Sequence, residues 1–165
     1  MMTEKESFIQ LEKNNVLKIK IKDSDGNDTG KYLTFDLEDI ELPLKLSQSE
    51  ELHRKNIEYL KSQLAIIEKK EEHKGKKLLS WKEEEKIKLL KRVYEDEMKA
   101  LDLFIGEGKT QMMLDIMGRK PYFTMYDDIG RILQPILPLI KQNKDDIANK
   151  IKEKYSLVED KEVLK

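Results

Sequence analysis

The residues best suited to chemistry in this sequence are Gly108, Lys109 and Thr110, which match the end of a phosphate-binding P-loop. A P-loop also requires a glycine five positions before its second glycine, and a strand that leads into the loop. Leu103 occupies that earlier position, and the residues around it repeat with the period of a helix. The run therefore predicts the end of one helix and the start of another, and we expect no nucleotide site.

The loop at 23–30 carries acidic and amide side chains at alternate positions, an arrangement typical of calcium loops. These side chains belong to Asp23, Asp25, Asn27 and Thr29. A calcium-binding EF-hand loop needs glycine at its sixth position and glutamate at its twelfth, where this chain has Asp28 and Thr34. The sequence favours a solvated turn, with weak cation binding as an open alternative.

Other chemical groups are isolated. His53 and His73 are the two histidines, and a zinc-binding helix would need them four residues apart. Asp127 and Asp128 are adjacent, so on a helix their side chains point about 100° apart and do not share a proton. Cysteine is absent, which excludes disulfides and thiolate sites. We expect a protein that is not an enzyme and that holds no cofactor and no metal.

Length and composition bound the remaining choices. At 165 residues with 38% hydrophobic content, the chain predicts a single domain over 1–165 with a modest core. Its 32 basic and 33 acidic residues nearly cancel, which argues against a dedicated nucleic-acid binder. The sequence has neither a signal-peptide pattern nor a run of about 18 apolar residues, so we expect a cytoplasmic protein and no membrane partner.

The N-terminal part has the pattern of a β-hairpin at about residues 15–37. Leu17, Ile19 and Ile21 alternate with lysines, which predicts a strand with one apolar face. Turn-forming residues fill 23–30, and a second alternating stretch follows. From 36 to 46 we expect an extended link, because Pro43 lies at its centre.

The rest of the chain predicts helices near 48–73, 81–105, 110–117, 121–141 and 144–155, with a frayed tail at 156–165. Capping boxes that begin at Ser47 and Ser80 open the first two helices, and Thr110 is placed to cap the third. Gly106 and Gly118 are helix stops.

Prolines shape the last part of this pattern. Pro121 is expected to open the fourth helix, while Pro135 and Pro138 predict a kink near Gln134. The fold class is therefore mainly α with an N-terminal β-hairpin, in which a helical hairpin precedes glycine-punctuated C-terminal helices.

One stretch carries a family resemblance. It contains Leu101, Asp102, Phe104, Gly106 and Gly108, then a small helix ending Ile116-Met117-Gly118, then Pro121-Tyr122-Phe123 and a long apolar helix. This order resembles the tail assembly chaperones of long-tailed phages and prophages of Gram-positive bacteria. The resemblance covers about residues 14–141. Its specific part is the glycine-punctuated connector between the long helices and the apolar helix, at residues 101–123.

The resemblance implies a function in phage tail morphogenesis. Such chaperones bind the tape measure protein and keep it soluble until the tail tube forms around it, so a tape measure protein or another phage tail protein is the expected partner. The alternative is a helical structural or adaptor protein that mediates oligomerisation or particle assembly. A homo-oligomer is compatible with both functions.

The segment from Tyr122 to Ile140 is apolar around nearly its whole circumference, which predicts surplus apolar surface for a partner. Its aromatic residues and the apolar residues beside the prolines are the expected partner contacts. They are Tyr122, Phe123, Tyr126, Leu133, Ile136 and Leu137. The alternative for each of them is a place in the core.

Overall fold

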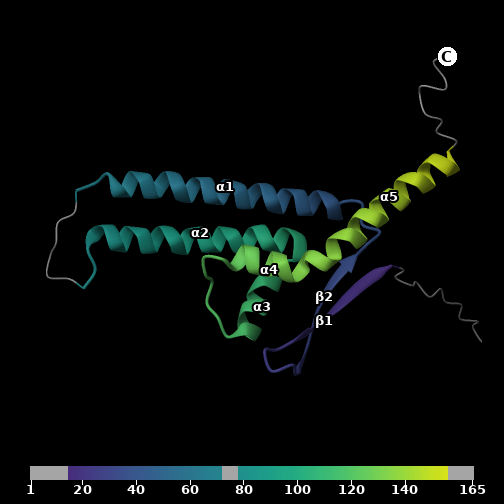
Figure 1. Cartoon of the computed structure of the whole chain (residues 1–165), viewed down its shortest axis with the longest axis horizontal. Coiled ribbons are helices and arrows are strands. Elements are labelled where there is room, and N and C mark those ends of the chain that lie inside the picture. The colour runs from purple at the N-terminus through teal and green to yellow at the C-terminus, as the bar shows by residue number, and fades with distance from the viewer. Residues whose placement is uncertain (1–14, 72–77, 156–165) are drawn as a thin grey trace, which may run out of the picture.

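A computed structural model describes residues 15–71 and 78–155 of the chain. Its elements, in chain order, are β1 (Val16–Lys22), β2 (Asp28–Asp36), α1 (Leu42–Glu68), α2 (Trp81–Ile105), α3 (Lys109–Met117), α4 (Met125–Leu133), the 3₁₀ turn η1 (Gln134–Ile136) and α5 (Leu137–Lys154). The chain is mainly helical with an N-terminal β-hairpin, which confirms the predicted fold class (Figure 1).

The β-hairpin forms as its alternating pattern predicts. β1 and β2 pair antiparallel, with Leu17 opposite Phe35 and Ile19 opposite Leu33. These side chains share one face, which packs onto the helices, and Phe35 meets Phe104 of α2 at a ring-centroid distance of 5.3 Å. In the turn, the Asp23 carboxylate accepts hydrogen bonds from the amides at 25 and 27, so it stabilises the turn itself.

The helical hairpin of α1 and α2 begins earlier than predicted. α1 starts at Leu42 with Pro43 in its first turn, so both the extended link at 36–46 and the cap at Ser47 were wrong. The first turn of a helix tolerates proline because its amide would have no partner there. α1 ends at Glu68 rather than 73, and residues 72–77, which include His73, lie outside the described residues.

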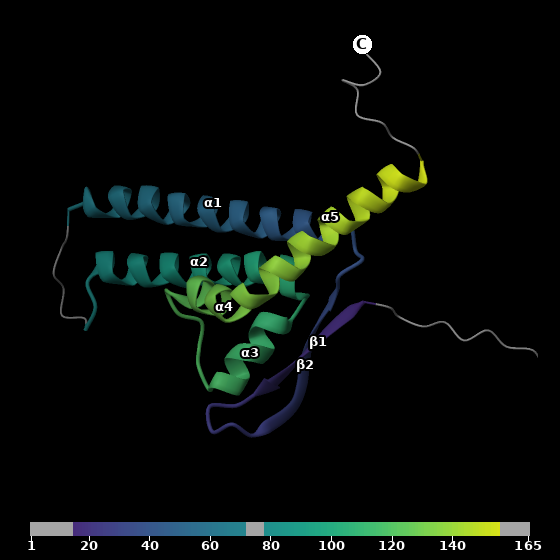
Figure 2. The ribbon, with the colours of Figure 1, turned by 45° about the vertical axis from the view of Figure 1, so that its right-hand side comes forward.

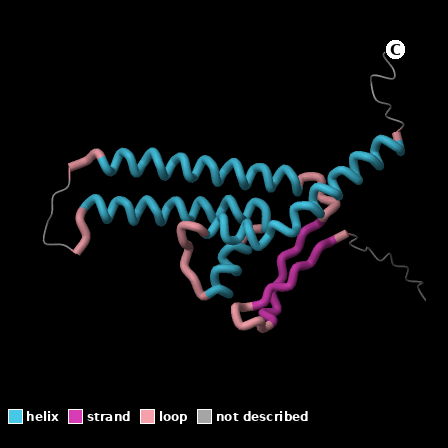
Figure 3. The backbone as a smooth tube through the Cα atoms, viewed as in Figure 1, coloured by secondary structure: helices cyan, strands magenta, loops and turns pink. Residues whose placement is uncertain are grey.

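α2 has the predicted bounds, and the capping box between Ser80 and Glu83 is confirmed. α1 and α2 run side by side over most of their length (Figure 3). Away from the β-hairpin they share only a narrow apolar core, formed by Leu60, Ile67, Leu89 and Val93.

Two glycines reverse the chain between α2 and α3. Gly106 ends α2 with φ 112° and ψ 150°, a combination that is nearly restricted to glycine, and Gly108 has φ 77°. Thr110 does not cap α3 as predicted, because it lies inside the helix. The Asp102 carboxylate of α2 takes that role, accepting hydrogen bonds from the Gly108 amide, the Thr110 amide and the Thr110 hydroxyl at 3.0, 3.0 and 2.6 Å.

The C-terminal helices differ from the prediction at two points. The fourth helix begins at Met125 rather than Pro121, so Tyr122 and Phe123 lie in a loop. In that loop the Arg119 guanidinium stacks on the Tyr122 ring at 3.6 Å. The interaction favours a turn at 119–124 over an immediate helix.

The kink near Gln134 is confirmed as η1, which separates α4 from α5. α5 then continues to Lys154, so the predicted separate helix at 144–155 was wrong. Both prolines occupy first-turn positions, of η1 and of α5, and the residues at 141–143 include neither glycine nor proline. The helix therefore has no reason to stop there.

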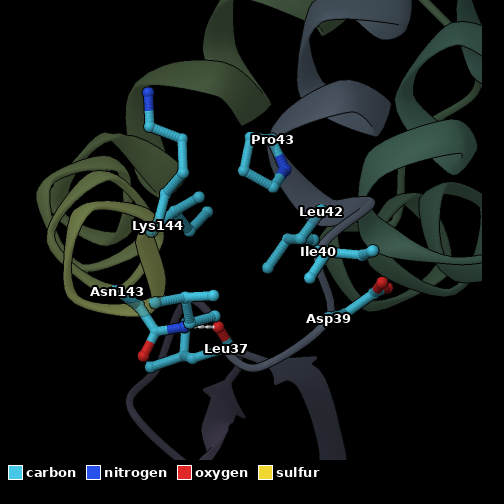
Figure 4. Close-up of a pocket in the computed structure, with 9 residues that line it drawn as sticks. Leu37, Asp39, Ile40, Leu42, Pro43, Asn143 and Lys144 are labelled. Carbon is cyan, nitrogen blue, oxygen red and sulfur yellow. Dashed lines mark hydrogen bonds between the residues drawn. The ribbon is translucent and has the colours of Figure 1, made fainter. Parts of the chain in front are cut away.

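The main core joins side chains of the β-hairpin to side chains of all the helices. Figure 2 shows the ribbon of the β-hairpin beside α3. One buried row runs along α4, η1 and α5, formed by Met125, Ile129, Leu133, Ile136 and Ile140. Where α5 passes the start of α1, the Asn143 side-chain amide donates to the Leu37 carbonyl beside a small cavity of about 60 Å³ (Figure 4). This contact fixes α5 to the exit of the β-hairpin.

The conformation of Gly106 predicts a stability effect. Gly106→Val should lower the free energy of unfolding by about 1–3 kcal/mol, because valine is strained at this φ. A β-carbon at 106 would also meet Lys109 Cγ at 3.2 Å. Gly130→Ala is the control, because Gly130 lies inside α4 with open space around it. This substitution should raise the free energy of unfolding by at most about 1 kcal/mol. Urea denaturation measures both free energies of unfolding. Equal stabilities of the two variants would contradict the positive φ assigned to Gly106.

Candidate functional site

The six predicted contact residues lie in different surroundings. Leu133 and Ile136 are core side chains, only 4% and 5% exposed. Tyr122, Tyr126 and Leu137 are partly buried and pack against that core. The exposed member of the set is Phe123, at 61%. For Leu133 and Ile136, then, the core alternative that the sequence left open describes the structure.

Tyr126 belongs to a polar cluster that joins α4 to both long helices. Its hydroxyl shares a hydrogen bond of 3.0 Å with the Ser49 hydroxyl of α1. Its ring stacks on the His53 ring, with centroids 3.9 Å apart and planes 2° apart. His53 in turn meets Glu97 of α2, with 2.8 Å between Nδ1 and Oε2. Three helices are therefore linked through one tyrosine and one histidine.

Glu97 is the unusual group in this cluster, because it is a carboxylate with only 4% exposure. Burial raises its pKa, while the hydrogen bond and charge of His53 act in the opposite direction. The Asn56 amide also lowers this pKa, yet Asn56 Nδ2 and Glu97 Oε1 have no hydrogen-bond partner by distance and angle. We read this as a close but poorly aligned contact, so the carboxylate is incompletely satisfied.

The polar cluster was missed at the sequence level, although a signal for it exists. Ser49, His53 and Asn56 interrupt the apolar stripe with which α1 faces α2, and Glu97 interrupts the facing stripe of α2. Polar residues at core positions of two neighbouring helices are expected to pair. The sequence alone suggested instead that His53 was solvated.

The helix N-terminus that resembled a P-loop is already occupied by an acid of the chain. The Asp102 carboxylate accepts the hydrogen bonds that a phosphate would accept at the start of α3. A bound phosphate would also have to lie beside this negative charge. The geometry supports a structural role for Gly108 and Lys109.

Groups of three or more His, Cys, Asp or Glu side chains placed to hold a metal ion do not occur within 15–71 and 78–155. Over the same residues, the helices are too short or too polar to cross a membrane.

Two apolar grooves flank the α4–η1 segment. The first, of about 260 Å³, lies between this segment and the α1–α2 pair, and Tyr126, Leu133 and Leu137 all line it. The second, of about 340 Å³, lies between β1, α3 and η1, and Leu133 and Ile136 form part of its floor. The predicted residues beside the proline kink thus border both grooves, although their own side chains point largely into the core.

The second groove also has exposed apolar residues that sequence reasoning did not single out. Ile132 and Met117 stand at its edge with 60% and 38% exposure. Their exposure follows from how α3 and η1 lie against β1, a long-range arrangement that helical periodicity does not show.

Comparison of the chain with known protein families, with curated proteins and with solved structures finds no match.

The buried Glu97 predicts a pH-dependent difference in stability. In the folded state the pKa of Glu97 is raised above its usual value of 4.5, so the folded chain holds this proton more tightly than the unfolded chain does. The resulting stabilisation is fully present below pH 4.5 and is lost as the pH rises through the raised pKa. Glu97→Gln has no such loss, so its stability relative to the unsubstituted chain should increase between pH 4.5 and pH 7.5.

Urea denaturation across this pH range measures the difference. Glu95→Gln is the matched control, because Glu95 lies on the exposed side of the same helix. A Glu97→Gln variant that loses stability relative to the unsubstituted chain as the pH rises would show that the carboxylate is well satisfied.

Proposed function

We propose that this chain is a non-enzymatic phage tail assembly chaperone, which binds the tape measure protein and keeps it soluble in the bacterial host cytoplasm during tail assembly. The observation that carries the proposal is the pair of apolar grooves on either side of α4–η1. The resemblance of the Leu101–Phe123 connector supplies the identity of the partner.

The contrast between these grooves and the rest of the surface supports a binding function. Charged residues make up 39% of the chain, yet the second groove is lined by apolar side chains and two lysines. An exposed apolar patch costs free energy in water, and such patches commonly mark protein interaction sites. A chaperone needs both features, because the charged surface keeps the complex soluble while the grooves hold the partner.

A structural adaptor is the second candidate, favoured by a different surface. A pocket of about 390 Å³ lies between α2 and the loop before α4, lined by Ile87, Leu90, Tyr94 and Pro121 with flanking charged residues. Ile87 is 52% exposed, so this face of α2 offers an apolar surface for another helix. An adaptor that uses this surface would stay in the finished particle.

Coexpression with the proposed partner, a tape measure protein, tests the proposal. The partner should move from the insoluble to the soluble fraction when the chain is present, and the chain should be missing from finished tails. Phe123→Ser should keep the helical circular dichroism, because the ring is exposed, and should solubilise less partner. Lys120→Ser, in the same loop, is the control. A partner that stays insoluble would refute the chaperone function, and a chain that remains in the tail would favour the adaptor.

A further inference from the structure

The groove between β1, α3 and η1 has a fixed floor and an exposed apolar edge. Its floor consists of core side chains, among them Leu33 and Met113, which are 2% and 7% exposed. Ile19 and Ile21 of β1 line one side, and Ile116 of α3 lines the other. Because the floor belongs to the main core, the groove exists before any partner binds.

The edge of this groove is where apolar surface remains in water. Ile132 and Met117 border it from α4 and α3, and Pro135 stands beside them. Methionine side chains are flexible and polarisable, so the exposed Met117 can adapt to differently shaped apolar groups. A continuous apolar channel with an adaptable side is suited to the apolar stripe of a helix.

Charge restricts the kind of helix that fits. Among the described residues, the charged side chains that line the groove are Lys20 and Lys22, and none of the lining residues is acidic. Lys20 pairs with Asp28 at 2.7 Å, whereas Lys22 has no ion pair within the part of the chain that the structure describes. Lys22 still lies close enough to Asp28 to lower the pKa of that carboxyl. The positive charge at the groove is therefore confined to its β1 side.

We propose that this groove binds an amphipathic helix whose apolar stripe is flanked by glutamate or aspartate side chains. The apolar stripe covers Ile132 and Met117, and the flanking acids face Lys22. The inference deepens the proposed function and rests on it for the natural partner, which would carry such a helix. A helix is the proposed occupant because helical side chains form the side of the groove opposite β1. β1 has a free edge in the two-stranded sheet, so an added strand is the alternative that the test must exclude.

Binding of designed peptides to the full chain tests the inference. The probe is a fluorescent helical peptide of about 18 residues with leucines at i, i+3, i+4 and i+7 spacing and glutamates beside them. The matched peptide has lysines in place of the glutamates. Fluorescence anisotropy should show binding of the glutamate peptide, at least about 10-fold weaker binding of the lysine peptide, and weakening of the glutamate complex by added salt.

Substitutions locate the binding site. Ile132→Asp should weaken binding of the glutamate peptide at least about 10-fold. The circular dichroism of the chain should not change, because Ile132 is exposed. Ile87→Asp is the matched control: Ile87 has similar exposure but lies on α2 outside the groove, so binding should not change. Lys22→Glu should weaken binding of the glutamate peptide and strengthen binding of the lysine peptide.

Several outcomes would overturn the inference. These are no binding of the glutamate peptide, equal binding of the two peptides, equal effects of Ile132→Asp and Ile87→Asp, or preferred binding of a β-forming peptide of the same composition. The peptide experiment tests the groove independently of the proposed chaperone function. If the glutamate peptide binds in the groove but the tape measure protein stays insoluble, the groove is correctly assigned and the chaperone function is not.

Discussion

The contact between Asp102 and the start of α3 is the constraint on which the groove side of the molecule depends. One carboxylate from the last turn of α2 takes hydrogen bonds from Gly108 and Thr110. This contact has a fully buried part, at Thr110, and an exposed part, at the Gly108 amide. It fixes the direction in which α3 leaves α2, and it thereby places Met113 and Leu114 in the main core. The groove exists because α3 is held in this direction, facing β1.

A second constraint holds α4 in place from the other side. Tyr126 reaches Ser49 and stacks on His53, which meets the buried Glu97, so α1, α2 and α4 are tied through polar contacts at one point. Apolar packing alone would allow α4 to slide, whereas hydrogen bonds require one register. Between these two constraints, η1 keeps its position with an apolar groove on each side, and both grooves stay partly open to water.

Local signals of the sequence accounted for most elements. The alternation in β1 and the capping box at Ser80 act within a few residues, so the β-hairpin and α2 were predicted closely. Two of the errors occurred at Pro43 and Pro121, where a proline is compatible with more than one local structure. Packing against distant residues decides between them. For the candidate site, periodicity identified an apolar segment, but only the arrangement of α3 and β1 shows that Ile132 faces solvent at a groove.

We propose that a partner helix lies between β1, α3 and η1. Amide hydrogen exchange of the chain, free and mixed with the proposed tape measure partner, tests this placement most directly. The account predicts slower exchange on binding in β1, α3 and η1, with unchanged exchange at 55–68 and 81–92, where α1 and α2 extend away from the β-hairpin (Figure 1). Protection confined to 55–68 and 81–92, with β1 and α3 unchanged, would contradict it.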